Sequence, residues 1–134
     1  MENLGMLFVF TLVTLTSCGV NEAEQMDSLE QTDILGEWKL DSRSVNGISD
    51  LSIQCCDYIE FKTDDDPSDL KGEFRSYGVG YETNGLFELK DSDKTIQFVY
   101  NDVQRAYEFQ LSDDRLTFTY PEDDSEIIEY WRKL

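Results

Sequence analysis

The chain has 134 residues, which suits one domain with a short extra segment at one end. Its 29 acidic and 11 basic residues give a formal net charge of −18, which would repel nucleic-acid phosphates and an anionic membrane surface. The chain contains no histidine, the commonest general base and transition-metal ligand. We therefore expect no nucleic-acid binding and no enzymatic activity. A hydrophobic fraction of 40% predicts that most of the chain folds despite its charge.

The amino-terminal segment reads as a secretory signal peptide. Residues 4–16 form an apolar run that is too short for a membrane-spanning helix, which needs about 20 residues. The run ends in Leu15-Thr16-Ser17-Cys18, which resembles the lipobox of bacterial lipoproteins. The resemblance implies cleavage after residue 17 and lipidation of Cys18 as the first mature residue. Residues 1–3 carry no positive charge, whereas signal peptides normally begin with one. The alternative is an ordinary secretory signal in which the position of Cys18 is a coincidence.

Lipidation would anchor the protein without a spanning helix. The natural location is the bacterial outer membrane, facing either the periplasm or the cell surface, with the membrane as a partner through Cys18. Residues 18–33 have few large apolar groups and are expected to form a flexible tether. Removal of residues 1–17 takes away a single charged residue, Glu2, so the mature part keeps a charge of −17.

Residues 34–134 show the pattern of an all-β domain. Short alternating segments recur about every dozen residues, and each places large apolar side chains at every second position. We expect strands at 35–43, 54–62, 71–77, 79–83, 86–90, 94–100, 104–111, 115–120 and 126–133.

The predicted connections are short and rich in turn-forming residues. Asn46-Gly47, Asn84-Gly85 and Asn101-Asp102 are typical of two-residue hairpin turns with positive φ angles. Short hairpins join antiparallel neighbours, so consecutive strands should form an up-and-down meander. Closure into a barrel of about eight strands would leave no exposed sheet edge.

Gly36-Glu37-Trp38, at the start of this domain, resembles the Gly-x-Trp signature of lipocalin-like proteins. Residues 34–134 as a whole resemble small bacterial lipocalin-like lipoproteins. The resemblance implies that Gly36 and Trp38 close one end of the barrel and that a late arginine, Arg132, covers the indole. Arg115 is the alternative cation for this role.

The resemblance also implies a small apolar ligand in or at the barrel. Inward-facing aromatic residues on the later strands would line its site: Tyr100, Tyr107, Tyr120, Phe98 and Phe109. Because the body carries a charge of −17, the ligand should be neutral or cationic, and a carrier of this type needs a cavity of about 300 Å³ or more. The alternative is a filled barrel that acts as a non-enzymatic interaction module of the envelope or cell surface. No cofactor is expected.

Two further features have plain structural interpretations. Cys55 and Cys56 are adjacent, so we expect buried or inert thiols, with a disulfide as the alternative. Residues 63–69 and 122–126 are rich in acidic side chains, but the first run lacks the glycine and the final glutamate of a calcium-binding hand. Both are expected to be solvated loops, and no metal site is predicted.

Overall fold

The computed structural model describes residues 28–134 except residues 53–55, 67, 91 and 93. The predicted signal peptide, Cys18 and most of the expected tether lie outside the described residues. The elements are one 3₁₀ turn and nine strands: η1 (Leu29–Gln31), β1 (Gly36–Val45), β2 (Ile48–Ser49), β3 (Tyr58–Thr63), β4 (Lys71–Gly78), β5 (Tyr81–Lys90), β6 (Thr95–Tyr100), β7 (Val103–Ser112), β8 (Arg115–Glu122) and β9 (Ser125–Lys133).

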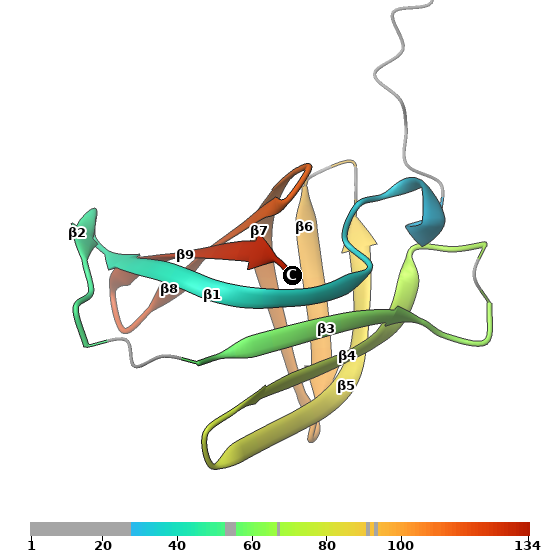
Figure 1. The fold of residues 1–134 in the computed structure, drawn as a ribbon, viewed down its shortest axis with the longest axis horizontal. Coiled ribbons are helices and arrows are strands. Elements are labelled where there is room, and N and C mark those ends of the chain that lie inside the picture. Colours follow the sequence, from blue (N-terminus) through green and yellow to red (C-terminus); the bar gives the residue numbers. More distant parts are fainter. Residues whose placement is uncertain (1–27, 53–55, 67, 91, 93) are drawn as a thin grey trace, which may run out of the picture.

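The strands form a closed antiparallel barrel, which confirms the predicted fold class (Figure 1). Neighbours follow the chain order from β3 to β9, and β1 closes the barrel because it pairs with both β3 and β9. Eight strands make up the wall, while the two-residue β2 pairs only with the far end of β1. This is an eight-stranded up-and-down barrel, consistent with a lipocalin-like fold.

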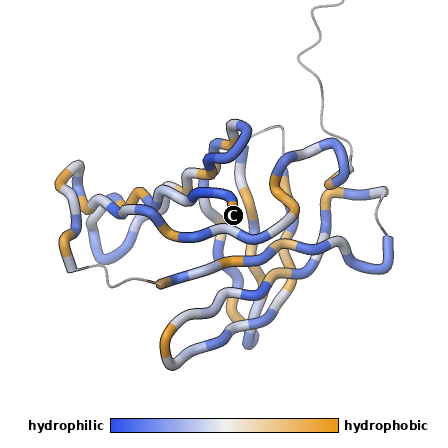
Figure 2. The backbone as a smooth tube through the Cα atoms, in the orientation of Figure 1, coloured by the Kyte–Doolittle hydropathy of each residue, from blue (hydrophilic) through white to orange (hydrophobic). Residues whose placement is uncertain are grey.

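Alternation along each strand fills the barrel with apolar side chains. Figure 2 shows apolar and polar stretches alternating along the strands. Strand β8 buries Leu116, Phe118 and Tyr120 and leaves the residues between them at least partly exposed. The aromatic rings meet at the centre, where Phe98 lies 5.8 Å from Phe118 and 4.9 Å from Phe74 between ring centroids.

Most of the connections predicted from turn-forming residues are confirmed. Asn46 and Gly47 both have positive φ angles, as do Asn101 and Asp102, so both pairs form the expected hairpin turns. The predicted turn at Asn84-Gly85 is wrong: both residues lie inside β5, which replaces the two strands predicted at 79–83 and 86–90.

Gly85 does not form a turn; its lack of a side chain permits close packing within the barrel wall. A Cβ atom at this position would lie 2.3 Å from the carbonyl oxygen of Val99 and 2.8 Å from the Phe74 ring. Glycine therefore allows β5 and β6 to approach each other inside the barrel wall, a role that sequence alone does not distinguish from a turn.

The folded domain begins earlier than residue 34. Leu29, in the segment expected to be a flexible tether, is completely buried, and its N–H donates to the carbonyl oxygen of Asp69 at 2.9 Å. Thr32 and Ile34 are buried as well. Element η1 therefore forms part of the hydrophobic core at one end of the barrel, which we call the closed end.

Candidate functional site

The closed end is organised around Trp38. The indole is completely buried, and its Nε1–H donates to the carbonyl oxygen of Ile34 at 2.8 Å. Gly36 has a φ of +119°, which a residue with a side chain rarely adopts. Gly36 thus supplies a backbone conformation that other residues rarely adopt, and Trp38 fills the core of the closed end.

The cation near Trp38 is Lys133, not Arg132 or Arg115. Lys133 lies opposite Trp38 in the β1–β9 ladder, and its Nζ lies 5.5 Å from the indole ring centroid. Arg132 is exposed because its neighbour Trp131 is buried and successive side chains point to opposite faces of a strand. Arg115, which pairs with Arg132 across the β8–β9 ladder, is also exposed.

The opposite end of the barrel, which we call the open end, contains a cavity of about 180 Å³. Three hairpin turns, 79–80, 101–102 and 123–124, lie at this end, together with the β1–β2 connection. The cavity is lined by aromatic, small polar and acidic side chains: Ile59, Phe74, Ser76, Thr83, Phe98, Tyr100, Tyr107, Glu129 and Trp131. It is smaller than the 300 Å³ expected of a carrier, because the closed half of the barrel is filled.

Of the described residues that line this cavity, Glu129 alone carries a charged side chain. Its position follows from the alternation of β9, where Ile127 and Trp131 are buried and Glu129 lies between them on the same face. A carboxylate thus replaces an apolar side chain in the inward-facing row.

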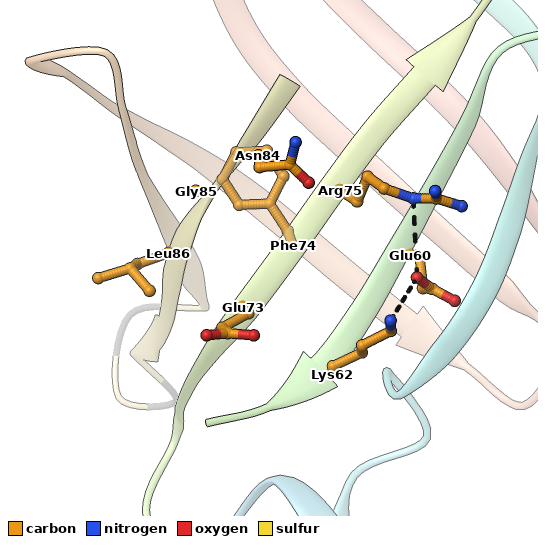
Figure 3. A pocket seen from close by; sticks show the side chains of 8 residues that line it. All are labelled: Glu60, Lys62, Glu73, Phe74, Arg75, Asn84, Gly85 and Leu86. Atoms are coloured by element: carbon orange, nitrogen blue, oxygen red, sulfur yellow. Dashed lines mark ion pairs between the residues drawn. The ribbon is translucent and has the colours of Figure 1, made fainter. Parts of the chain in front are cut away.

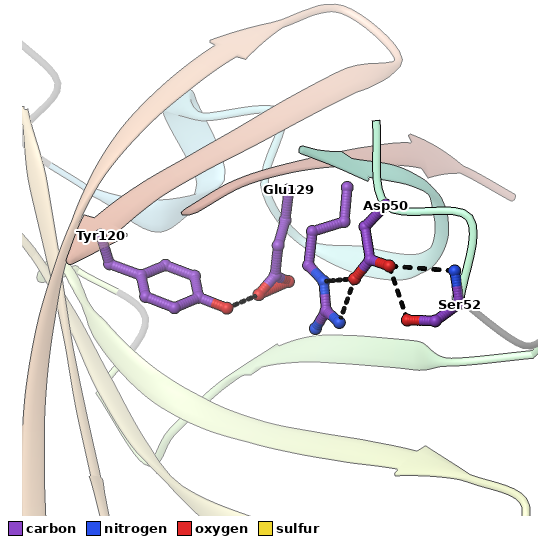
Figure 4. A network of polar contacts seen from close by, with 5 residues as sticks. Asp50, Ser52, Tyr120 and Glu129 are labelled. Carbon is purple, nitrogen blue, oxygen red and sulfur yellow. Dashed lines mark hydrogen bonds and ion pairs between the residues drawn. The ribbon is translucent and has the colours of Figure 1, made fainter. Parts of the chain in front are cut away.

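The Glu129 carboxylate is held by two donors. The Tyr120 hydroxyl donates to Oε1 at 2.5 Å (Figure 4). Trp131 Nε1–H donates to Oε2 at 3.2 Å. Burial nevertheless raises the pKa of Glu129 above its usual value, while these hydrogen bonds oppose the rise. Burial also raises the pKa of Tyr120, and the neighbouring Glu129 charge raises it further. The tyrosine therefore stays a hydrogen-bond donor at neutral pH.

A stacked tyrosine pair forms one wall of this region. The rings of Tyr107 and Tyr120 lie 4.2 Å apart between centroids with an interplanar angle of 21°. The β7–β8 ladder ends at the pair Glu108 and Thr119, one position before the tyrosines. On the outer surface a groove of about 510 Å³ lies over this point, and both tyrosines contribute to it.

A second surface hollow, of about 360 Å³, lies on the outside of β3, β4 and β5 (Figure 3). Its charged groups neutralise one another: Glu60 lies 3.1 Å from Lys62 Nζ and 3.8 Å from Arg75 Nε. Because three of its four charged side chains pair with one another, this hollow is a weaker candidate for a charged ligand than the cavity at Glu129.

The predicted ligand-lining residues fall into two groups. Tyr100, Tyr107 and Phe98 line the cavity, and Tyr120 lies beside it through its bond to Glu129. Phe109 is buried but does not line the cavity.

The sequence analysis missed Glu129, the most informative residue of the site. The sequence does contain a signal for it: Ile127 lies two residues before Glu129 and Trp131 lies two residues after it, so all three side chains point to the same face of the strand. An acidic residue in the apolar row of a strand is unusual enough to be singled out.

The remaining polar features give no second site. Cys56 is disulfide-bonded, so the expectation of a free thiol is wrong for this residue, while Cys55 lies outside the described residues. In the acidic loop at 63–69, Asp66 accepts hydrogen bonds from the backbone N–H and hydroxyl of Ser68. Among the residues that the structure describes, no three Cys, Asp or Glu side chains are grouped to hold a metal ion.

No helix in the described part of the chain has the length and apolar character needed to cross a membrane. Comparison with known proteins found no matching family model, no matching curated protein and no matching solved structure.

Proposed function

We propose that this protein is a lipid-anchored, lipocalin-like barrel that binds a small organic cation in the cavity at its open end, without catalysing a reaction. The observation that carries this proposal is the Glu129 carboxylate, partly buried among aromatic rings. A buried negative charge is costly unless it is compensated, and a bound cation would supply the missing charge.

The aromatic lining favours an ammonium group over a metal ion. The aromatic side chains of Tyr100, Tyr107, Phe98 and Trp131 line the same small space as Glu129. Aromatic cages of this kind bind alkylated ammonium groups through cation–π contacts. The volume of about 180 Å³ limits the occupant to a small cation or to the cationic head of a larger molecule.

The expected lipid anchor agrees with this arrangement. The described chain begins with Ser28 and Leu29 at the closed end, so an anchor at Cys18 would join the domain at the end opposite the cavity. Mass spectrometry of the amino-terminal peptide should show acylated Cys18, and the Cys18→Ala protein should no longer partition with membranes. Membrane partitioning by that variant would contradict the anchor.

Binding is tested with choline and its neutral isostere 3,3-dimethylbutan-1-ol, by calorimetry on the full-length protein in detergent. We expect choline to bind more than tenfold more tightly, because only the cation interacts with the Glu129 charge. The Glu129→Gln variant should abolish this preference, whereas Glu108→Gln, a change on the outer face, should keep it. Equal binding of choline and the alcohol to the native protein would overturn the proposal.

A second candidate function is protein interaction through the hairpin tips of the open end. Ile48 is 74%, Leu51 94% and Val79 85% exposed, and Figure 2 shows apolar colour at the tips of the β1–β2 and β4–β5 hairpins. Exposed apolar residues at loop tips are available to contact a partner protein. This alternative would be favoured if the Glu129→Gln variant lost choline binding but kept the biological activity of the native protein.

A further inference from the structure

A β-bulge in β1 brings an arginine to the position opposite Glu129. Leu40 lies opposite Trp131, but the register then shifts by one residue, so that Arg43 lies opposite Glu129 and Val45 opposite Ile127. Without the bulge, Ser42 would occupy the position facing Glu129. The extra residue therefore places a guanidinium on the same side of the barrel wall as the carboxylate.

Arg43 is nevertheless bound to a different carboxylate. Its Nη2–H donates to Asp50 Oδ2 at 2.6 Å and its Nε–H donates to the same oxygen at 3.1 Å. The backbone N–H of Asp50 also donates to the carbonyl oxygen of Arg43 at 2.8 Å. The connection that follows β2 thus holds Arg43 through both its side chain and its backbone.

Asp50 is itself oriented by Ser52 (Figure 4). The backbone N–H and the hydroxyl of Ser52 donate to Asp50 Oδ1 at 2.9 and 2.5 Å, which leaves Oδ2 for Arg43. These hydrogen bonds, with that from Arg43, lower the pKa of Asp50 to about 2, so the pair is fully charged at neutral pH. Arg43 is therefore fixed before any ligand binds.

Glu129 remains without a cationic partner as a result. In the described part of the chain it forms no ion pair, and its hydrogen bonds come from the neutral donors of Tyr120 and Trp131. Arg43, the cation across the ladder, and Asp57 are the other charged groups that influence its carboxyl. A guanidinium tethered this close would compete strongly with any dissolved ammonium for that carboxylate.

We propose that Asp50 is a positioning residue that holds Arg43 away from Glu129 and thereby keeps the carboxylate free for an external organic cation. This inference rests on the proposed function of the cavity. Asp50 does not touch the ligand in this account. Asp50 determines whether the Glu129 carboxylate keeps its negative charge available in the cavity or is neutralised by Arg43.

The test is the Asp50→Ala variant of the full-length protein in detergent, with Asp50→Asn as a second variant that retains the oxygen accepting from Ser52. Released Arg43 should turn toward Glu129. The pKa of the Glu129 carboxyl, followed by ¹³C NMR without ligand, should therefore fall, and choline affinity should drop at least tenfold. Adding Arg43→Gln to Asp50→Ala should restore both values.

Glu82→Ala is the matched control, because it removes one negative charge from the β4–β5 hairpin of the open end without touching Arg43. An unchanged Glu129 pKa in both Asp50 variants would overturn the inference, as would an equal loss of affinity in Glu82→Ala. The titration needs no ligand, so it separates the two proposals. Failure of native protein to bind choline refutes the function, and failure of the pKa to move refutes the role of Asp50.

Discussion

Among single residues, the charged side chains at the two ends of the barrel differ in their partners. At the closed end, Lys133 lies over the Trp38 indole and its Nζ donates to the carbonyl oxygen of Asp33 at 2.8 Å. At the open end, Glu129 faces aromatic rings with neutral donors only. Lys133 therefore has an acceptor and a ring within the fold, whereas no cation in the described part of the chain forms an ion pair with Glu129.

Lys133→Met tests the contact at the closed end. We expect the free energy of unfolding to fall by about 1 kcal/mol, because the variant keeps the apolar stem but loses the cation over the indole. Arg132→Met, one residue earlier and exposed, should change it by less than about 0.5 kcal/mol. Urea unfolding followed by tryptophan fluorescence measures both. A larger effect at Arg132 would restore the arginine to the closing role.

Glu129 should make stability depend on pH. Burial raises its pKa in the folded state above the ordinary value of 4.5, so between these two pKa values the folded protein binds more protons than the unfolded chain. Stability from this group therefore falls as the pH rises through that window. Glu129→Gln lacks this contribution, so its stability relative to the native protein should increase from pH 4 to pH 7. A difference in unfolding free energy that stays constant with pH would contradict the shift.

At the scale of secondary-structure elements, Pro121 explains why the β7–β8 ladder stops. The hairpin register directs the backbone groups of alternate β8 residues, including Thr119 and Pro121, toward β7. The next bonded pair after Glu108 and Thr119 would join Ala106 to Pro121, which has no N–H to donate. The strands part at this point, and the stacked Tyr107 and Tyr120 fill the gap.

Pro121→Val should extend the ladder by one pair. The new N–H can donate to the Ala106 carbonyl, so the amides of Ala106 and Val at position 121 should exchange slowly with deuterium. The free energy of unfolding should change little, because a new hydrogen bond of about 1 kcal/mol is offset by the greater freedom of the unfolded chain. Thr119→Val, which already has an N–H, is the control. An unchanged exchange rate at Ala106 would show that another contact separates the strands.

For the molecule as a whole, residues 29–34, which precede β1, contribute to the core. Leu29 and Ile34 are completely buried, and a Cβ added to Gly72 would lie 2.9 Å from a Leu29 methyl group. Element η1 therefore covers the closed end, while the opposite end keeps its cavity.

Leu29→Ala should lower the free energy of unfolding by about 2–5 kcal/mol, since it removes a buried side chain at a site that can collapse only partly. Glu30→Ala, at the exposed neighbouring position, should change it by less than about 0.5 kcal/mol. Denaturant unfolding with a far-UV signal measures both. A fragment 34–134 as stable as the full chain would return the domain boundary to residue 34.

The all-β class, the antiparallel order and most hairpins could be predicted from the sequence, because they follow from local signals. Alternation in segments such as Leu116-Phe118-Tyr120 defines the buried face, and pairs such as Asn46-Gly47 define the turns. The expected aromatic residues Phe98, Tyr100 and Tyr107 reached the cavity for the same reason.

Only the tertiary structure decided features that depend on contacts between distant strands. The function of Gly85 depends on the approach of Val99, the choice of Lys133 over Arg132 depends on the β1–β9 register, and the burial of Leu29 depends on the closed end. The site at Glu129 is of this kind too, since a one-residue bulge in β1 selects Arg43 as its cross-strand neighbour. Local sequence fixes which way a side chain points along its own strand, but the partner it meets is set by closure of the barrel.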